Sequence, residues 1–110
     1  MGRTYNDGAN LRWLGSATGV TPISDSTHVG AWHCIEAHAR LNDAGAANGV
    51  FELWIDGQPE AIRTGLNWVG AFAAYGFNAV FLENYWNAGS PVAQERYFDD
   101  FVVASQRIGC

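Results

Sequence analysis

Two segments in which polar and apolar residues alternate constrain the fold of this chain more than any other feature. They span residues 30–41 and 50–56, and the loop-like run NDAGAANG separates them. Side chains on a strand alternate between its two faces, so each segment has one apolar and one polar face. We expect two antiparallel strands whose apolar side chains are buried together: Ile35, Ala37, Leu41, Phe51, Leu53 and Ile55.

Turn signals indicate that the second of these strands continues into a hairpin. Asp56-Gly57 is a strong two-residue hairpin signal, and residues 58–63 then form the returning strand. Pro59 lacks a backbone N–H, which places it on an edge strand or at a bulge.

The rest of the chain predicts further short strands and no long helix. The segment 67–75 is ambiguous between strand and helical turn, and the other candidate strands are residues 10–14, 16–25, 77–86 and 96–104. About seven short strands separated by turns favour an all-β sandwich or barrel. With 110 residues, the chain fits a single domain spanning residues 1–110.

Composition narrows the classes of partner. The net charge of -5 disfavours nucleic acid and anionic membrane surfaces, and no apolar run is long enough to span a bilayer. Five Trp residues in so short a chain favour strands and flat binding surfaces.

The two cysteines are too few for a disulfide framework. We expect Cys34, within an apolar strand, to be a buried free thiol rather than half of a bridge. Cys110 is the last residue of the chain and is expected to be mobile.

Several motifs resemble the C-terminal half of concanavalin A-like lectin/glucanase jelly rolls, a superfamily that includes polysaccharide lyases. The similar parts are Trp32-His33-Cys34-Ile35-Glu36, Leu41-Asn42, the run GVFELWIDG at 49–57, and the ending RYFDDFVV at 96–103 followed by Arg107-Ile108-Gly109. The resemblance implies an antiparallel jelly-roll-like β-sandwich, in a truncated or minimal version because jelly rolls of this kind are longer than this chain.

The polar faces of the two alternating segments form the candidate binding site, whose residues are Glu36, His38, Arg40, Glu52 and Trp54. Carboxylates and arginine hydrogen-bond sugar hydroxyls or uronate carboxylates, and an indole stacks on the apolar face of a pyranose. With the resemblance, this predicts binding of a polysaccharide or oligosaccharide. The alternative is a solvated strand face with cross-strand ion pairs.

Catalysis is the rival hypothesis, as a polysaccharide lyase or glycoside hydrolase, although no catalytic set is complete. Glu36 and Glu52 are the one carboxylate pair to consider for glycoside hydrolysis, and His38 with Tyr85 or Tyr97 would be the acid–base pair of a lyase. No cofactor or metal is expected, since Asp99-Asp100 suits hydrogen bonds to nearby backbone better than calcium.

A third hypothesis is a truncated, self-assembling β domain without retained activity. The chain has no Lys and three Pro, so little protects its strand edges from pairing with another chain. We predict a homo-oligomer, most simply a two-fold dimer, unless residues 1–25 complete the sheets within the same chain.

Overall fold

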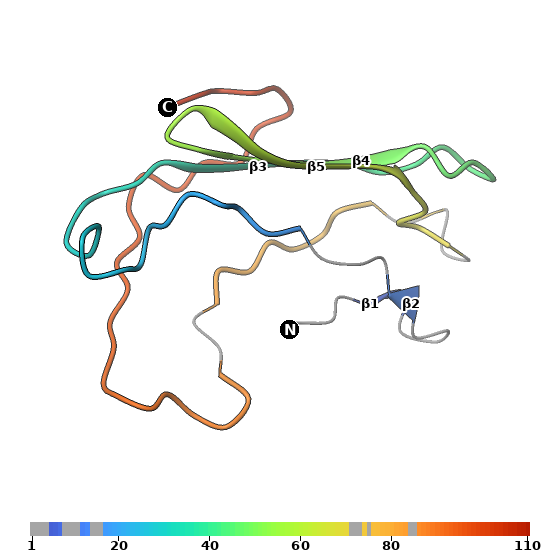
Figure 1. Ribbon diagram of the computed structural model, residues 1–110. Helices are drawn as coiled ribbons and strands as arrows, with labels where there is room; N and C mark the ends of the chain where they lie inside the picture. Colours follow the sequence, from blue (N-terminus) through green and yellow to red (C-terminus); the bar gives the residue numbers. More distant parts are fainter. Residues whose placement is uncertain (1–4, 8–11, 14–16, 71–73, 75, 84–85) are drawn as a thin grey trace.

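A three-stranded antiparallel sheet with the order β3-β4-β5 is the main element of the computed structural model (Figure 1). Its strands are β3 (Ile35–Arg40), β4 (Gly49–Ile55) and β5 (Gln58–Leu66). The strands β1 (Tyr5–Asp7) and β2 (Arg12–Trp13) form a separate antiparallel pair.

The structure describes residues 5–7, 12–13, 17–70, 74, 76–83 and 86–110. No helix occurs among these residues, and the prediction of an all-β chain is confirmed for them. Within the same residues, no segment has the length and helical structure needed to cross a membrane. The β-sandwich stays a prediction, because the three-stranded sheet is not paired with a second sheet of comparable size in the described part of the chain.

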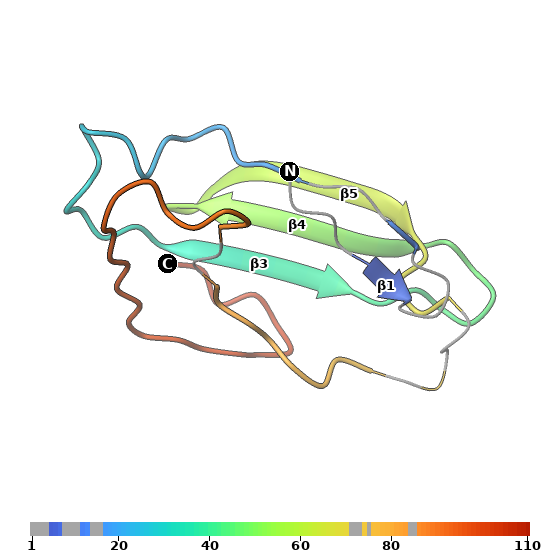
Figure 2. The same cartoon turned by 90° about the horizontal axis from the view of Figure 1, so that it is seen from below.

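The predicted pairing of the two alternating segments is confirmed. In the β3–β4 ladder Ile35 is opposite Ile55, Ala37 is opposite Leu53, and the register runs without interruption to Arg40. Figure 2 shows the three strands side by side, with β4 in the middle. One face of both strands therefore carries apolar side chains, and the other carries the charged and polar side chains together with Val50 and Trp54.

The hairpin turn forms at Asp56-Gly57, as predicted. Both residues have positive φ angles, 49° and 77°, which matches the type I′ turn that suits a two-residue hairpin. The Asp56 carboxylate also accepts hydrogen bonds from the Cys34 backbone N–H (2.9 Å) and from His33 Nδ1 (2.8 Å). These bonds, that of His33 foremost, lower the pKa of Asp56 and fix the start of β3 to the turn.

Pro59 meets both expectations raised by its sequence position. It lies on β5, at an edge of the three-stranded sheet. The register also shifts there, since Trp54 pairs with Pro59 while Leu53 pairs with Ala61. Glu60 is thus the extra residue of a β-bulge, which increases the local twist of the strand.

Glu60 attaches the segment before β3 to the sheet. Its carboxylate accepts hydrogen bonds from the backbone N–H groups of Val20 (2.6 Å) and Thr21 (3.0 Å) and from the Thr21 hydroxyl (2.5 Å). The hydroxyl bond is the main cause of the lowered pKa of Glu60, and the backbone bonds add to it. The preceding Gly19 lies so close to the apolar face that a Cβ there would be 3.0 Å from Ile55 Cδ1.

The prediction of six apolar side chains buried together is wrong in part. Ile55 is buried, but Ile35 is 50% exposed and Ala37 is also exposed. Leu41, Phe51 and Leu53 are half-buried. The reason is that the apolar face is covered by irregular segments, seen below the sheet in Figure 1, rather than by a second sheet with its own row of side chains.

Three predicted strands are absent from the residues that the structure describes. The described parts of 16–25 and 77–86, and all of 96–104, lack ladder pairing. Large apolar side chains along the last two segments are exposed, among them Phe81, Phe101 and Val103. Their β-propensity is real, but a strand needs a neighbour for its backbone groups, and the described part of the chain supplies none to these segments.

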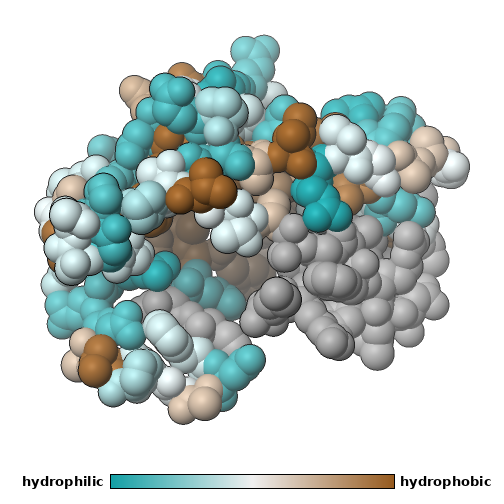
Figure 3. All heavy atoms as spheres, in the orientation of Figure 1, coloured by the Kyte–Doolittle hydropathy of each residue, from teal (hydrophilic) through white to brown (hydrophobic). Residues whose placement is uncertain are grey.

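The chain exposes more surface than a compact domain of its length. Its accessible surface is 8727 Å², against about 6,000 Å² for a compact monomer of 12.0 kDa. Its radius of gyration is 15.7 Å, against roughly 13 Å. Figure 3 shows apolar residues open to solvent and a hollow on one side of the molecule.

Candidate functional site

The predicted site residues share one face of the sheet. In the β3–β4 register Glu36 is opposite Trp54, and His38 is opposite Glu52. Arg40 lies two residues further along β3 and has the same parity. We call this surface the polar face. The structure therefore brings the five predicted residues onto one surface, although it does not join them all in one network.

His38 and Glu52 form a pair in the middle of the polar face. His38 Nδ1 lies 2.8 Å from Glu52 Oε2, and the two side chains are 50% and 28% exposed. A carboxylate only accepts, so Nδ1 carries the proton of this bond. In neutral His38 the other ring nitrogen, Nε2, is then an acceptor, which suits it to bind a hydroxyl group.

Arg40 turns toward the loop that joins β3 and β4. Its guanidinium donates to the Asn48 carbonyl (3.0 Å) and to Asp43 Oδ1 (3.3 Å). Asp43 also binds the Asn48 side chain, and this bond, together with the charge of Arg40, lowers the pKa of Asp43. Arg40 therefore lies at one end of the polar face, and these hydrogen bonds are with the loop rather than with His38 or Glu52.

The other end of the polar face is covered by residues from the C-terminus, which sequence reasoning missed. The Arg107 guanidinium carbon lies 4.2 Å from the centre of the Trp54 ring, and Nε donates to Glu36. The Gly109 N–H also donates to Glu36, at 2.6 Å. These bonds, that of Arg107 first, hold the pKa of Glu36 below its ordinary range. Glu36 is only 17% exposed, so this end of the polar face is largely covered.

A disulfide between Cys34 and Cys110 fastens this C-terminal segment. The two Cα atoms are 6.0 Å apart, and the bridge spans 76 positions of sequence. The expectation of a free thiol at Cys34 and a mobile Cys110 is therefore wrong. The physical reason is that the fold brings the C-terminus beside the start of β3, as Figure 2 shows. The spacing of the two cysteines in the sequence does not reveal this proximity.

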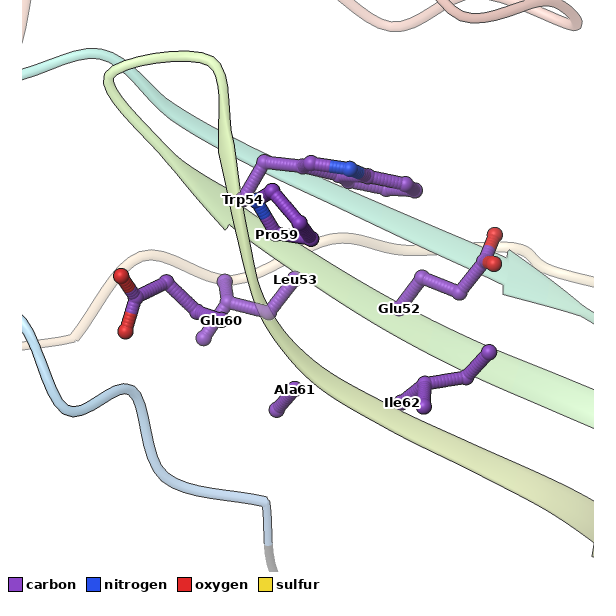
Figure 4. A pocket seen from close by; sticks show the side chains of 7 residues that line it. All are labelled: Glu52, Leu53, Trp54, Pro59, Glu60, Ala61 and Ile62. Carbon is purple, nitrogen blue, oxygen red and sulfur yellow. The ribbon is translucent and has the colours of Figure 1, made fainter.

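A depression of about 330 Å³ is lined by residues of β4 and β5. Figure 4 shows Trp54 with Pro59 on one side of the strands and Glu60 with Ala61 on the other. Trp54 and Glu52 contribute to its lining, and so do four residues of β5, which sequence reasoning did not place at the site. The lining residues are Glu52, Leu53, Trp54, Pro59, Glu60, Ala61 and Ile62.

The other candidate groups lie elsewhere or are engaged locally. Tyr85 lies outside the described residues, and Tyr97 is 73% exposed, with its hydroxyl donating to Glu95 at 2.5 Å. Asp99 accepts a hydrogen bond from the Asp100 N–H, as predicted for this dipeptide. No group of three or more potential metal ligands occurs among the residues that the structure describes.

Comparison with known proteins leaves the resemblance to jelly rolls as a prediction. No protein-family model, no curated protein and no solved structure matches the chain.

Proposed function

We propose that the polar face binds a polysaccharide or oligosaccharide, with Trp54 as the stacking platform. The observation that carries this proposal is the joint position of Trp54 and the His38–Glu52 pair on adjacent strands of one face. Residues two apart on a strand are about 6.6 Å apart, close to the size of a sugar ring. An indole and hydrogen-bonding groups at this spacing suit successive rings of a saccharide chain.

The protein's surface supports a binding role more strongly than a catalytic one. Glu36 is held as a carboxylate by Arg107 and Gly109, so it is unsuited to the role of general acid. Of the two tyrosines considered as lyase acids, Tyr97 is engaged by Glu95 and its pKa is raised by that bond. Lyase or hydrolase activity is the alternative outcome of the test below.

A glycan array followed by calorimetry tests the proposal. Both the disulfide form and the thiol-reduced form should be screened, because Arg107 covers one face of Trp54. For a glycan that binds, we expect Trp54→Ala to weaken affinity about tenfold through loss of stacking. Trp32→Ala is the matched control, since Trp32 is 70% exposed and precedes the sheet. Equal losses in both variants, or no binding by either form, would contradict the proposal.

The same samples should be assayed for depolymerisation. Unsaturated uronate absorbance indicates a lyase, and new reducing ends without that absorbance indicate a hydrolase. Either result would replace the binding role with the catalytic alternative.

Self-association is a second candidate function, favoured by the exposed apolar side chains of residues 77–108. The excess surface of about 2,700 Å² per chain is more than the roughly 1,000–2,500 Å² per chain that most obligate homodimers bury, so a second copy can cover only part of it. We propose that a second copy of the chain covers part of this surface. The positions of β3 and β5 at the two edges of the described sheet support this, because an edge strand can pair with another chain.

A further inference from the structure

Arg107 and Gly109 together make three contacts that hold the C-terminal residues against the polar face. The Arg107 guanidinium stacks on Trp54 and pairs with Glu36, and the Gly109 N–H donates to the same carboxylate. One residue later, Cys110 is bonded to Cys34, directly before β3. We call residues 107–110 the C-terminal strap.

The strap occupies the place that a saccharide ring needs. A guanidinium carbon 4.2 Å from the ring centre lies over the indole within the range of cation–π attraction, where the apolar face of a pyranose would stack. Glu36, which would accept hydrogen bonds from sugar hydroxyls, has its two oxygens bonded to Arg107 and Gly109. One end of the binding surface is thus filled by the protein's own cation.

We propose that the Trp54–Glu36 site is a guanidinium site whose internal ligand, Arg107, blocks the saccharide platform until the Cys34–Cys110 disulfide is reduced. The inference rests on the proposed function for its saccharide ligand. The guanidinium site itself, and its dependence on the disulfide, rest on the contacts of the strap alone.

The Cys34–Cys110 disulfide determines the fraction of time for which Arg107 occupies the Trp54–Glu36 site. The Arg107 side chain is 48% exposed, and exposed ion pairs are weakened by water and salt. Tethering keeps the guanidinium at a high effective concentration beside Trp54. Once the disulfide is reduced, the contacts of Arg107 and Gly109 alone must offset the entropy lost when residues 107–110 are ordered. The strap therefore spends a larger fraction of the time away from the polar face.

The chemistry of release is thiol–disulfide exchange with an external dithiol. A thiolate of the reductant attacks the Cys110 sulfur, which is on the exposed residue of the pair, and Cys34 leaves as a thiolate. The second thiolate of the reductant then attacks the mixed disulfide, frees Cys110 and closes the oxidised reductant into a ring. Two electrons and two protons pass from the dithiol to the two cysteine sulfurs.

Acrylamide quenching of Trp54 fluorescence tests the block without any glycan. The Trp54 signal is the difference between the protein and its Trp54→Phe variant. We expect dithiothreitol to increase the quenching of Trp54, and Arg107→Gln to increase it with the disulfide intact. The Cys34→Ser/Cys110→Ser double variant is the matched control, which should be quenched strongly and be insensitive to dithiothreitol. Unchanged quenching in the reduced protein and in Arg107→Gln would overturn the proposal.

Glycan binding then separates this inference from the proposed function. With the disulfide intact, we expect Arg107→Gln to bind the glycan about tenfold more tightly than the unmodified protein does. This factor corresponds to a site that Arg107 occupies roughly nine-tenths of the time, because only the remaining tenth can bind the glycan. Loss of the strands in circular dichroism on reduction, with no gain in Arg107→Gln, would also overturn the block. Increased quenching without glycan binding in any form would support the guanidinium site and reject the saccharide.

Discussion

Asn42 joins two loops from a buried position, and both polar atoms of its side chain are hydrogen-bonded. Its amide nitrogen donates to the Ala46 carbonyl (2.8 Å) and to Asn67 Oδ1 (3.2 Å), and its oxygen accepts from the Val69 N–H (3.1 Å). The residue is 8% exposed, so its partners find little water to replace these bonds. Asn42 thereby ties the loop after β3 to the segment after β5.

We expect Asn42→Ala to lower the free energy of unfolding by about 2 kcal/mol, because it leaves buried donors and acceptors unpaired. Urea denaturation followed by circular dichroism measures the change. Asn48→Ala is the matched control, since it removes a similar amide from an exposed part of the same loop, and it should cost less than about 0.5 kcal/mol. Equal costs for both variants would show that the buried network is not the cause.

Glu36 makes the attachment of Arg107 dependent on pH. Its pKa is lowered in the folded chain, first by Arg107, so the charged form is favoured by the contact. The stabilisation is complete above the pKa of an unfolded glutamate, about 4.3, and is lost as pH falls through the lower folded value.

We therefore expect the ring-current shift that Trp54 imposes on the Arg107 side chain to persist through mildly acidic pH and to decrease only in strong acid. Nuclear magnetic resonance during an acid titration measures it. In Glu36→Gln the shift should be smaller and nearly independent of pH. A decrease centred above pH 5 in the unmodified chain would contradict this origin.

At the scale of the strands, Gly49 is the position least able to accept a side chain. It begins β4, is buried, and a Cβ there would lie 2.5 Å from Trp68 Cδ1 and 2.7 Å from the Leu66 carbonyl. Backbone cannot withdraw as a flexible side chain can, so the added methyl must displace the end of β5.

We expect Gly49→Ala to destabilise the chain by about 2 kcal/mol, as a shift in its thermal or urea midpoint. Gly76→Ala is the control, because a Cβ there meets nothing within 4 Å and Gly76 has no positive φ. A larger loss at Gly76 than at Gly49 would contradict the packing argument.

The sequence predicted β3, β4 and β5 because local information is sufficient for them. Alternation over two segments and an Asp-Gly turn determine pairing, register and the shared face of Glu36, His38, Glu52 and Trp54. The segment 96–104 has similar propensity but no such partner close in sequence, and it forms no strand. Pairing over long sequence distances is not encoded in propensity, and so that prediction failed.

The missed parts of the candidate site have the same cause. Arg107 is distant in sequence from Trp54 and Glu36, and no spacing rule brings a C-terminal arginine onto a strand near the middle of the chain. The available signal was the pair of cysteines flanking these elements, Cys34 just before β3 and Cys110 just after Arg107. Treated as a bridge, the pair would have placed the strap beside Glu36.

At the scale of the whole molecule, the exposed apolar segments predict association. We expect light scattering at micromolar concentration to give a mass near twice 12.0 kDa, because a second copy would cover apolar surface that one chain leaves open. Phe101→Ser together with Val103→Ser should weaken the dimer, as both side chains are exposed and belong to no strand. A mass near 12 kDa at all concentrations would contradict the prediction.

The disulfide also determines how the molecule responds to mechanical load. If the chain is pulled by its two terminal residues, tension passes from Cys110 directly into Cys34. The residues between the two cysteines, which include β3, β4 and β5, then lie outside the loaded path. Force then extends only the part before Cys34. Reduction adds the bypassed length, roughly 250 Å of extended chain. In an optical trap the disulfide would therefore carry the load, and the sheet would not be stretched while the bond is intact.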